Sequence, residues 1–405
     1  MLPFHVAYSI GFTDDSDCRA CVPVSFPEPS ADAKIHSDRV RRAIAEEICA
    51  AGGWIPFSRY MDIALYAPGL GYYAAGARKF GASGDFVTAP EITPLFARAL
   101  AAQVAELMRR SEPAVLEVGA GTGALAAELL AELDANGASP QAYTIIEVSA
   151  DLRQRQARML GSRAPNLAGR IRWLDRLPER FSGVLLANEV LDVMPVQLLS
   201  WRENGLLELG IALDGDGSFR WEERPAHGRA PEYARRIIVE PPYVSEICLP
   251  AQAWVEAWGT ILERGALLLI DYGFPRREYY HPQRATGTLR CHYRHRAHDD
   301  PLLLPGLNDI TSHVDFTAIA EAGAAAGLEL LGYCTQAAFL LNCGVLDILG
   351  RIPPGSGARY LKAAADVQRL LNPAEMGELF KVIALGRNVR GGLLGFRSGD
   401  RSHTL

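Results

Sequence analysis

The feature that most constrains the fold of this chain is the stretch AVLEVGAGTGALAAELLAEL, residues 114–133. An apolar run ends at Glu117, and three glycines follow at alternate positions, Gly119, Gly121 and Gly123. Apolar residues then recur at helical spacing, so the stretch predicts a strand, a glycine turn and an amphipathic helix. Glycines let the backbone approach a ligand closely, and the helix N-terminus presents free N–H groups to the turn. The stretch therefore predicts a cofactor site, and the alternative is a tight turn without a ligand.

The spacing of the turn distinguishes between cofactors. The dinucleotide fingerprint is G-x-G-x-x-G with an acidic residue about 20 positions further on. This chain has G-x-G-x-G, and its next strand-end carboxylate, Glu147, lies 24 residues after Gly123 (147 − 123). The pattern resembles the first motif of class I S-adenosylmethionine (SAM) methyltransferases. In that family the turn holds the methionine part of SAM and the second strand's carboxylate binds both ribose hydroxyls. The resemblance thus implies cofactor roles for Glu117, the three glycines and Glu147.

Composition narrows the function classes. The chain has 405 residues, 49% of them hydrophobic, which is enough for two or three structural units with a sizeable core. The net charge of −6 argues against nonspecific binding to nucleic acid or to an anionic membrane, while it allows an acidic cleft for a cationic substrate. No apolar stretch reaches the roughly 18 residues of a membrane helix. We therefore expect neither nucleic-acid binding nor membrane insertion.

Cysteine usage points to a reduced compartment. The chain has seven scattered cysteines, an odd number that is typical of an intracellular protein. Cys18 and Cys21 form C-x-x-C, but no second pair follows for zinc, so we interpret them as incidental thiols. The first 34 residues are acidic and contain several prolines, unlike a transit or signal peptide. We expect a cytoplasmic location, with the mitochondrial matrix as the alternative for a eukaryotic protein.

Strand and helix patterns alternate after the glycine turn. Continuous apolar strands separated by helices predict a parallel sheet covered on both faces, and we expect seven strands in a Rossmann-like α/β fold. Ligands of such sheets gather at the carboxyl ends of the strands. Polar side chains at predicted strand ends can therefore share one crevice: Glu117, Glu147, Asp175, Asn188 and Glu189. Further strands are expected at 143–149, 171–175, 183–192, 265–273, 328–335 and 380–387.

The remaining segments are interpreted as extensions and insertions. We expect a disordered tail or misassigned start at 1–36, a helical extension with a cofactor-covering segment at 37–110, the core domain at 111–390 and a tail at 391–405. Insertions are predicted at 199–245, 274–308 and 336–379. The first contains an antiparallel hairpin at 199–224, and the last is mostly helical. Helices are further expected at 37–51, 56–65, 88–109, 245–263 and 314–326.

Six motifs make the resemblance more specific. They are GDFVTAPEITPLF (84–96), LEVGAGTG (116–123), IIEVSADLRQRQ (145–156), ANEVLDVMPV (187–196), DYGFPRREYYHP (271–282) and DITSHVDF (309–316). Together they resemble the MidA family, bacterial and mitochondrial SAM-dependent methyltransferases related to the respiratory complex I assembly methyltransferase, over about residues 37–390. The resemblance implies a class I methyltransferase fold with an N-terminal helical extension and inserted segments, and arginine methylation of a complex I subunit. Residues 1–36 match nothing in the family pattern, and Val193-Met194 is a mild departure.

The chemistry of arginine methylation selects two catalytic candidates. Methyl transfer from a sulfonium is an in-line displacement, so the enzyme chiefly positions the nucleophile. Because the pKa of arginine is far above 7, carboxylates that grip the guanidinium bidentately replace a conventional base. Glu189 and Asp192, at i and i+3, would present both carboxylates on one side of a helical turn. The alternatives are that Asp192 caps the following turn or binds backbone N–H groups, and that Glu189 is solvated surface.

Four further residues are candidates for the cofactor site. The resemblance implies that the segment with Gly84 and Asp85 lines the SAM pocket, where Asp85 would bind the methionine ammonium group; the alternative is an ordinary turn aspartate. Asp175 fits an acceptor for the adenine amino group, or a loop acid. Asn188 could reach the cofactor or its own backbone.

The histidines suggest no metal site. His281, His292, His295 and His298 lie close together in sequence, but they lack the partnering cysteine or carboxylate spacing of a zinc site. Their segment could be a flap on the substrate side. His313 precedes a predicted helix, so it either belongs to an N-terminal cap cluster or aligns substrate as a third catalytic residue.

The patterns favour a SAM-dependent methyltransferase that acts on an arginine of a protein partner, and the resemblance implies a respiratory-complex subunit as this partner. Three alternatives remain: a small-molecule O- or N-methyltransferase, a SAM-binding assembly factor with little catalysis, and a hydride-transfer enzyme.

Overall fold

The computed structural model describes residues 27–75 and 88–405, and the chain divides into two compact units. Unit 1 combines Met1–Ala75, Pro195–Ile247 and Tyr280–Ser312. Unit 2 combines Gly76–Met194, Cys248–Tyr279 and His313–Leu405. The insertions expected at 199–245 and 274–308 thus fall, within a few residues, into one unit with the first part of the expected extension, residues 37–75. The later part of that extension, which contains the helices at 89–110, belongs to unit 2. In the described residues no helix is long and apolar enough to cross a membrane.

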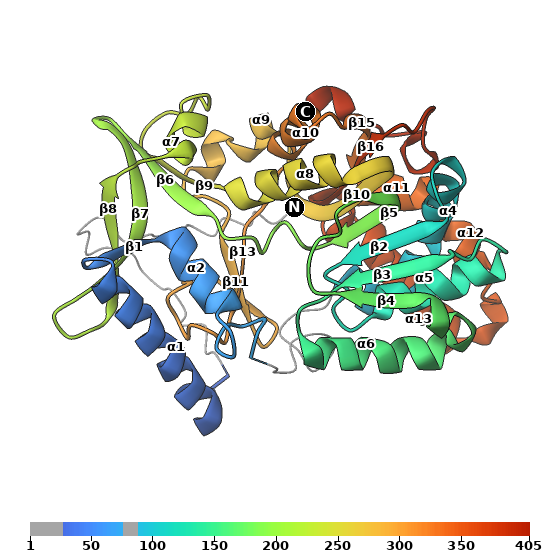
Figure 1. The fold of residues 1–405 in the computed structure, drawn as a ribbon, viewed down its shortest axis with the longest axis horizontal. Coiled ribbons are helices and arrows are strands. Elements are labelled where there is room, and N and C mark those ends of the chain that lie inside the picture. The colour runs from blue at the N-terminus through green and yellow to red at the C-terminus, as the bar shows by residue number, and fades with distance from the viewer. Residues whose placement is uncertain (1–26, 76–87) are drawn as a thin grey trace. The chain divides into compact units, whose positions relative to one another are not determined.

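Unit 2 is built on a mostly parallel sheet (Figure 1). Its strand order is β15-β16-β10-β5-β2-β3-β4, and the short strand β14 pairs with β10. Strands β2, β3, β4, β5 and β10 run parallel, whereas β16 is antiparallel to both of its neighbours. The bounds are β2 Ala114–Val118, β3 Ala142–Ile146, β4 Ile171–Leu174, β5 Phe181–Asn188, β10 Leu262–Phe274, β14 Val314–Asp315, β15 Glu329–Thr335 and β16 Phe380–Arg387. The predicted seven strands are confirmed, and β14 is an addition.

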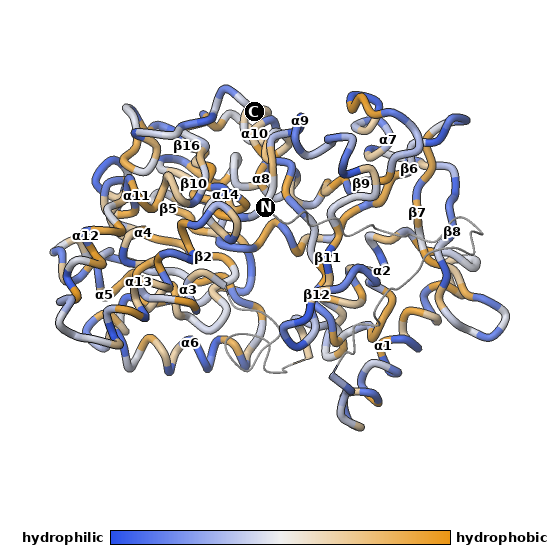
Figure 2. The backbone as a smooth tube through the Cα atoms, turned by 180° about the vertical axis from the view of Figure 1, so that it is seen from behind, coloured by the Kyte–Doolittle hydropathy of each residue, from blue (hydrophilic) through white to orange (hydrophobic). Residues whose placement is uncertain are grey.

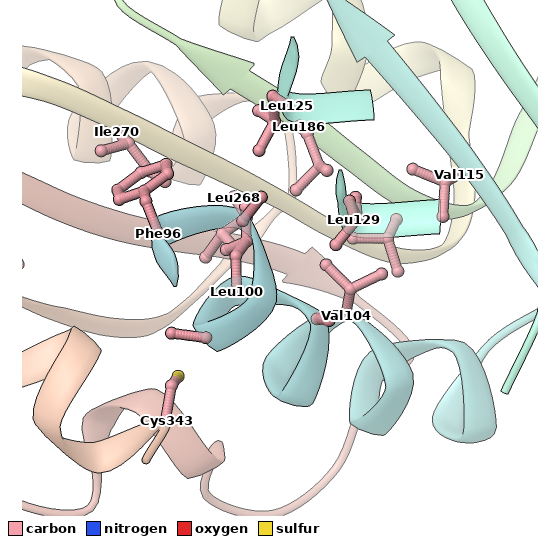
Figure 3. Packing of buried hydrophobic residues seen from close by; sticks show 14 of the residues in the cluster. Phe96, Leu100, Val104, Val115, Leu125, Leu129, Leu186, Leu268, Ile270 and Cys343 are labelled. Carbon is pink, nitrogen blue, oxygen red and sulfur yellow. The ribbon is translucent and has the colours of Figure 1, made fainter. Parts of the chain in front are cut away.

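Helices bury both faces of this sheet. Successive residues of a strand point to opposite faces, so Leu268 and Leu267 of β10 lie in different hydrophobic clusters. Figure 3 shows the first cluster, where Leu100 of α4 (Pro94–Arg110) and Leu129 of α5 (Ala124–Ala135) lie against the strands. The second cluster contains Trp258 of α8 (Leu249–Ile261) and residues of α10 (Phe316–Ala325). Both faces are thus covered, as expected from the apolar strands.

Three more groups of helices belong to unit 2. The short helix α3 (Ala89–Ile92) precedes α4, and α6 (Ala150–Arg163) follows β3. The excursion expected at 336–379 is helical: α11 Gln336–Asn342, α12 Val345–Gly350, α13 Ala358–Leu371 and α14 Met376–Leu379. Figure 2 shows hydrophilic and hydrophobic residues alternating along α6, which is the pattern of a helix with one solvent-facing side.

Unit 1 contains two small antiparallel sheets. The larger has the order β1-β7-β6-β9 with β8 paired to β7, and the smaller the order β12-β11-β13. The hairpin expected at 199–224 is confirmed as part of the larger sheet. The bounds are β1 Trp54–Pro56, β6 Gln197–Arg202, β7 Gly205–Leu213, β8 Phe219–Pro225, β9 Tyr243–Ile247, β11 Arg290–Tyr293, β12 Arg296–His298 and β13 Asp309–Thr311, with helices α1 Ala31–Ala50, α2 Phe57–Tyr66, α7 Arg229–Ala234 and α9 Arg276–Tyr279, the last in unit 2.

Three sequence-based boundaries are wrong. Helix α1 begins at Ala31, because the Ser30 side chain accepts a hydrogen bond from the N–H of Ala33 at 3.3 Å, so 31–36 do not belong to a disordered tail. The helix expected at 88–109 breaks at Thr93, whose extended backbone (φ −156°) precedes a proline. The start of the helix expected at 245–263 falls in strand β9.

Candidate functional site

The glycine turn lies between β2 and α5 and needs its glycines. Gly119, Gly121 and Gly123 have φ values of 71°, 52° and 86°, in the left-handed region that other residues seldom adopt. A Cβ on Gly119 would lie 2.8 Å from Cγ2 of Val190. The turn is also held from outside, because the hydroxyl of Thr122 donates to the carboxylate of Glu91 in α3. The predicted strand, turn and helix are confirmed.

Glu117 lies inside β2 and is 2% exposed. The hydroxyl of Tyr143, on the neighbouring strand β3, donates to its Oε2 at 2.6 Å. Burial raises the pKa of Glu117 to about 7, while the bond from Tyr143 acts in the opposite direction. A contact of Glu117 with a cofactor stays a prediction.

Glu147 directly follows β3 and is buried. Its Oε1 accepts from the N–H of Ser149 at 2.9 Å, and its Oε2 accepts from Nε2 of Gln156 at 3.1 Å. Burial raises the pKa of this carboxyl, although both hydrogen bonds favour its charged form. Ser149 and Gln156 therefore bind different oxygens of the carboxylate, at the strand end where we expect a ligand.

Strands β4 and β5 end differently. Asp175 is exposed directly after β4. Asn188 is the last residue of β5, and its Nδ2 donates to Oε1 of Glu189 at 3.1 Å. Its Oδ1 is buried without a hydrogen-bond partner in the part of the chain that the structure describes. Since buried polar atoms are normally paired, this oxygen suits a donor supplied by a ligand.

The expected helical turn at Glu189 and Asp192 is wrong. Glu189 has a φ of 54°, which belongs to the left-handed region, and residues 189–194 form a bend and a turn. The backbone N–H of Glu189 donates to the carbonyl of Ile270 at 2.9 Å. Asp192 is buried, and its backbone N–H donates to another carboxylate, that of Asp271. The two side chains thus do not share one face of a helix, and their catalytic role stays a prediction.

Asp271, on β10, is the residue that organises this loop, and the sequence-based site omitted it. Its Oδ2 accepts from the N–H groups of Val190, Leu191 and Asp192 at 3.2, 2.9 and 3.3 Å. Its Oδ1 accepts from the N–H of Tyr272 at 2.9 Å. Burial and the nearby charge of Glu189 raise its pKa, and the N–H donors oppose that shift. An acid at the end of a long apolar run, as at Glu117, was the available signal.

His313 lies beside the end of β10 rather than in a helix cap. Its ring centroid is 5.2 Å from those of Tyr272 and Phe274. The N-cap of α10 is Asp315, whose side chain accepts from the N–H of Ala318 at 3.1 Å. The predicted alternative that His313 belongs to the N-terminal cap of this helix is therefore wrong. An aligning role stays a prediction.

Gly84 and Asp85 lie outside the described residues. Among the described residues, no three metal-binding side chains form a possible metal site. Burial and then the charge of Arg290 lower the pKa of His292 to about 4.

The comparisons decide the identity of this site. A family model described as S-adenosyl-L-methionine-dependent methyltransferase matches residues 95–334. The chain belongs to this family. It is also similar to a crystal structure from Burkholderia thailandensis bound to S-adenosyl-homocysteine (SAH), at 52% identity and a TM-score of 0.91, over 94% of this chain and 100% of that one. The resemblance to the MidA family and the predicted class I fold are thereby confirmed, and SAM is the cofactor.

The methyltransferase also resembles curated animal proteins. It is 28% identical over 388 residues to "Protein arginine methyltransferase NDUFAF7, mitochondrial" of Danio rerio, over 87% of each chain. It is 29% identical over 366 residues to the protein of that name in Homo sapiens, over 82% of this chain and 80% of that one.

The residues present in the methyltransferase fit SAM. Left-handed glycines leave room at the turn, the N-terminus of α5 offers backbone N–H groups, and Glu147 offers two acceptor oxygens. The unpartnered Oδ1 of Asn188 adds a buried acceptor. This donor and acceptor set matches an amino acid and a ribose carried by one ligand.

Proposed function

We propose that this methyltransferase transfers a methyl group to an arginine nitrogen of a partner protein. The observation that carries the proposal is the similarity of the chain to proteins named as protein arginine methyltransferases. The identity is 28% to the protein of Danio rerio and 29% to that of Homo sapiens, and at least 80% of each chain is covered. The acidic loop 188–192 supports it, because a guanidinium needs carboxylate partners.

The proposed chemistry uses the loop after β5. SAM supplies an electrophilic methyl group on its sulfonium. The carboxylates of Glu189 and Asp192 hold the guanidinium in line with that methyl group, so that one nitrogen lone pair faces it. Glu189 then accepts the proton that the methylated nitrogen releases. His313 aligns the substrate from the end of β10.

The backbone of Glu189 supports a functional role for this side chain. A non-glycine residue with left-handed φ costs on the order of 1 kcal/mol or more, and such residues cluster at active sites. Here the three N–H groups of residues 190–192 bound by Asp271 and the bond from Glu189 to Ile270 hold the loop in place. The loop is thus rigid enough to position a substrate.

The test of the substrate class is a labelling experiment. Purified protein is incubated with methyl-labelled SAM and cell lysate, and the labelled species is separated and hydrolysed to amino acids. We expect label in methylated arginine of one protein. Label in a small molecule would establish the O- or N-methyltransferase alternative, and label in another amino acid would overturn the arginine proposal.

The proposed residues are tested separately. We expect Glu189→Gln and Asp192→Asn to lower the methyl-transfer rate by about a hundredfold or more, while the Kd for SAH changes by less than about threefold. The exposed Glu179→Gln serves as the charge control. Full transfer by both variants would contradict their role, and retained biological activity without transfer would favour the assembly-factor alternative.

The family resemblance extends the proposal to a complex I-type subunit as the partner. Cysteine usage favours the cytoplasm as the location, and the alternative is the mitochondrial matrix, the location in the names of the animal relatives. Mass spectrometry of the labelled protein tests the first, and fractionation of cells tests the second.

A further inference from the structure

Gln156 of α6 links three parts of the SAM site. It is fully buried. Its Nε2 donates to the carbonyl of Gly121 at 3.0 Å and to Oε2 of Glu147 at 3.1 Å, and its Oε1 accepts from Nε1 of Trp173 at 2.9 Å. The whole primary amide is therefore used, two N–H groups as donors and the oxygen as acceptor.

Chemistry fixes the orientation of this amide. An indole N–H only donates, and a backbone carbonyl only accepts. The amide oxygen of Gln156 must therefore face Trp173, and its nitrogen must face Gly121 and Glu147. The same residue packs against the turn, because a Cβ on Gly123 would lie 3.3 Å from Cα of Gln156. One side chain thus sets the distance between the glycine turn and the carboxylate.

We infer that Gln156 is a positioning residue for SAM, which aims the Glu147 carboxylate at the ribose hydroxyls and locks it to the glycine turn. The inference rests on the ribose role of Glu147 and is independent of the arginine substrate proposed above. With the N–H of Ser149 on Oε1, Gln156 on Oε2 and the backbone of Val148 as a further donor, the carboxylate is held against rotation, and its two oxygens together keep acceptor capacity for the ribose hydroxyls.

The first test compares two ligands and two variants by calorimetry. Gln156→Met keeps the length of the side chain and removes its donors, and Gln154→Met on the exposed side of α6 is the matched control. We expect Gln156→Met to weaken SAH binding on the order of tenfold to a hundredfold, and to leave the weaker binding of 2′,3′-dideoxy-SAH within about threefold of wild type. Gln154→Met should change neither. An equal loss for both ligands, or no loss for SAH, would overturn the inference.

A second variant keeps the inference testable should Gln156→Met not fold. Gln156→Glu keeps the shape and the bond from Trp173, but at pH 8 it places a second negative charge beside Glu147. We expect its SAH affinity to rise at least about tenfold as the pH is lowered to 6, because a protonated carboxyl again donates to Glu147. The wild type should show no such rise. An unchanged pH profile would contradict the positioning role.

A separate variant tests the assumption that Glu147 binds the ribose hydroxyls. Glu147→Gln should weaken SAH binding and leave 2′,3′-dideoxy-SAH unaffected. If Glu147→Gln binds both ligands as the wild type does, Glu147 does not hold the ribose and the inference falls with it. The arginine proposal is untouched by that result.

Discussion

At the residue scale, Glu189 combines an unfavourable backbone with a candidate chemical role. Its φ of 54° places Cβ close to the following carbonyl. The bond of its N–H to Ile270 and the carboxylate of Asp271 under the next three residues keep that conformation. The proposed chemistry requires the carboxylate of Glu189, whereas its backbone conformation favours glycine. Substitutions at this position can separate the two effects.

We expect Glu189→Gly to raise the free energy of unfolding by about 1 kcal/mol and to abolish methyl transfer. Glycine adopts this φ without strain, although its greater freedom in the unfolded chain offsets part of the gain. Glu189→Gln keeps Cβ and should not gain this stability. Urea denaturation of both variants measures the difference, and equal stabilities would show that the backbone is not strained.

The buried Glu117 predicts a pH dependence of stability. Its pKa is raised from the usual 4.5 to about 7 in the folded protein, because burial favours the protonated form. Its contribution to the free energy of unfolding is therefore fully present below pH 4.5 and is lost as the pH rises through 7. Glu117→Gln should therefore gain up to about 3 kcal/mol relative to wild type between pH 5 and 8. Denaturation at several pH values checks this.

The control is Tyr143→Phe, which removes the hydrogen bond that favours the charged form of Glu117. We expect the loss of stability to move to higher pH in this variant. A difference between wild type and Glu117→Gln that stays constant from pH 5 to 8 would rule out titration of Glu117 in this window.

At the scale of elements, the site combines the turn after β2, the end of β3 and the loop after β5, and the turn packs against this loop. The Cβ position of Gly119 faces Val190. A larger side chain in the turn would therefore displace the loop that carries the proposed catalytic residues.

Gly119→Ala tests this contact against a matched position. Gly137 has nearly the same φ, 65°, but a Cβ added there would have no atom within 4 Å, whereas a Cβ on Gly119 would clash at 2.8 Å. We expect the free energy of unfolding to fall by about 1 kcal/mol in both alanine variants, because alanine is strained at this φ. In Gly119→Ala it should fall by about 1–3 kcal/mol more, because the added methyl group overpacks against Val190. Thermal denaturation and SAH titration measure this, and equal effects would contradict the close packing.

Asp271→Asn tests the brace under the loop after β5. The amide keeps one acceptor oxygen in place of two, so either the bonds from residues 190–192 or the bond from Tyr272 are lost, and the charge that strengthens them is removed. We expect the free energy of unfolding to fall by about 1–3 kcal/mol. The methyl-transfer rate should fall more than the SAH affinity, because the loop carries Glu189. The exposed Asp216→Asn is the control. An unchanged transfer rate would show that the brace is not needed for catalysis.

Local patterns predicted most elements and few of the contacts between them. The alternate glycines and apolar strands sufficed for β2, α5 and the strand ends, because those signals lie within about 20 residues. The break at Thr93 was not predicted, because a proline also fits the first turn of a helix. Strand β9 was not predicted, because a short apolar run also fits a helical pattern. Gln156 escaped because its partners, Gly121, Glu147 and Trp173, are brought together only by folding.

At the scale of the whole molecule, chemistry-bearing residues are concentrated in one unit. The described candidates Glu117, Glu147, Asn188, Glu189 and His313 all belong to unit 2, at or near the carboxyl ends of its parallel strands. The part of the N-terminal extension up to Ala75 and two insertions, far apart in sequence, belong to unit 1. Sequence patterns placed these three segments but did not predict that they fold together, since no local signal records their pairing.

The most direct test of this account is a crystal structure of the protein with SAH. We predict both ribose hydroxyls within about 3 Å of the Glu147 carboxylate, the homocysteine part against Gly119–Gly123, and the sulfur facing Glu189. SAH bound away from the ends of β2 and β3, or a ribose that does not contact Glu147, would contradict it.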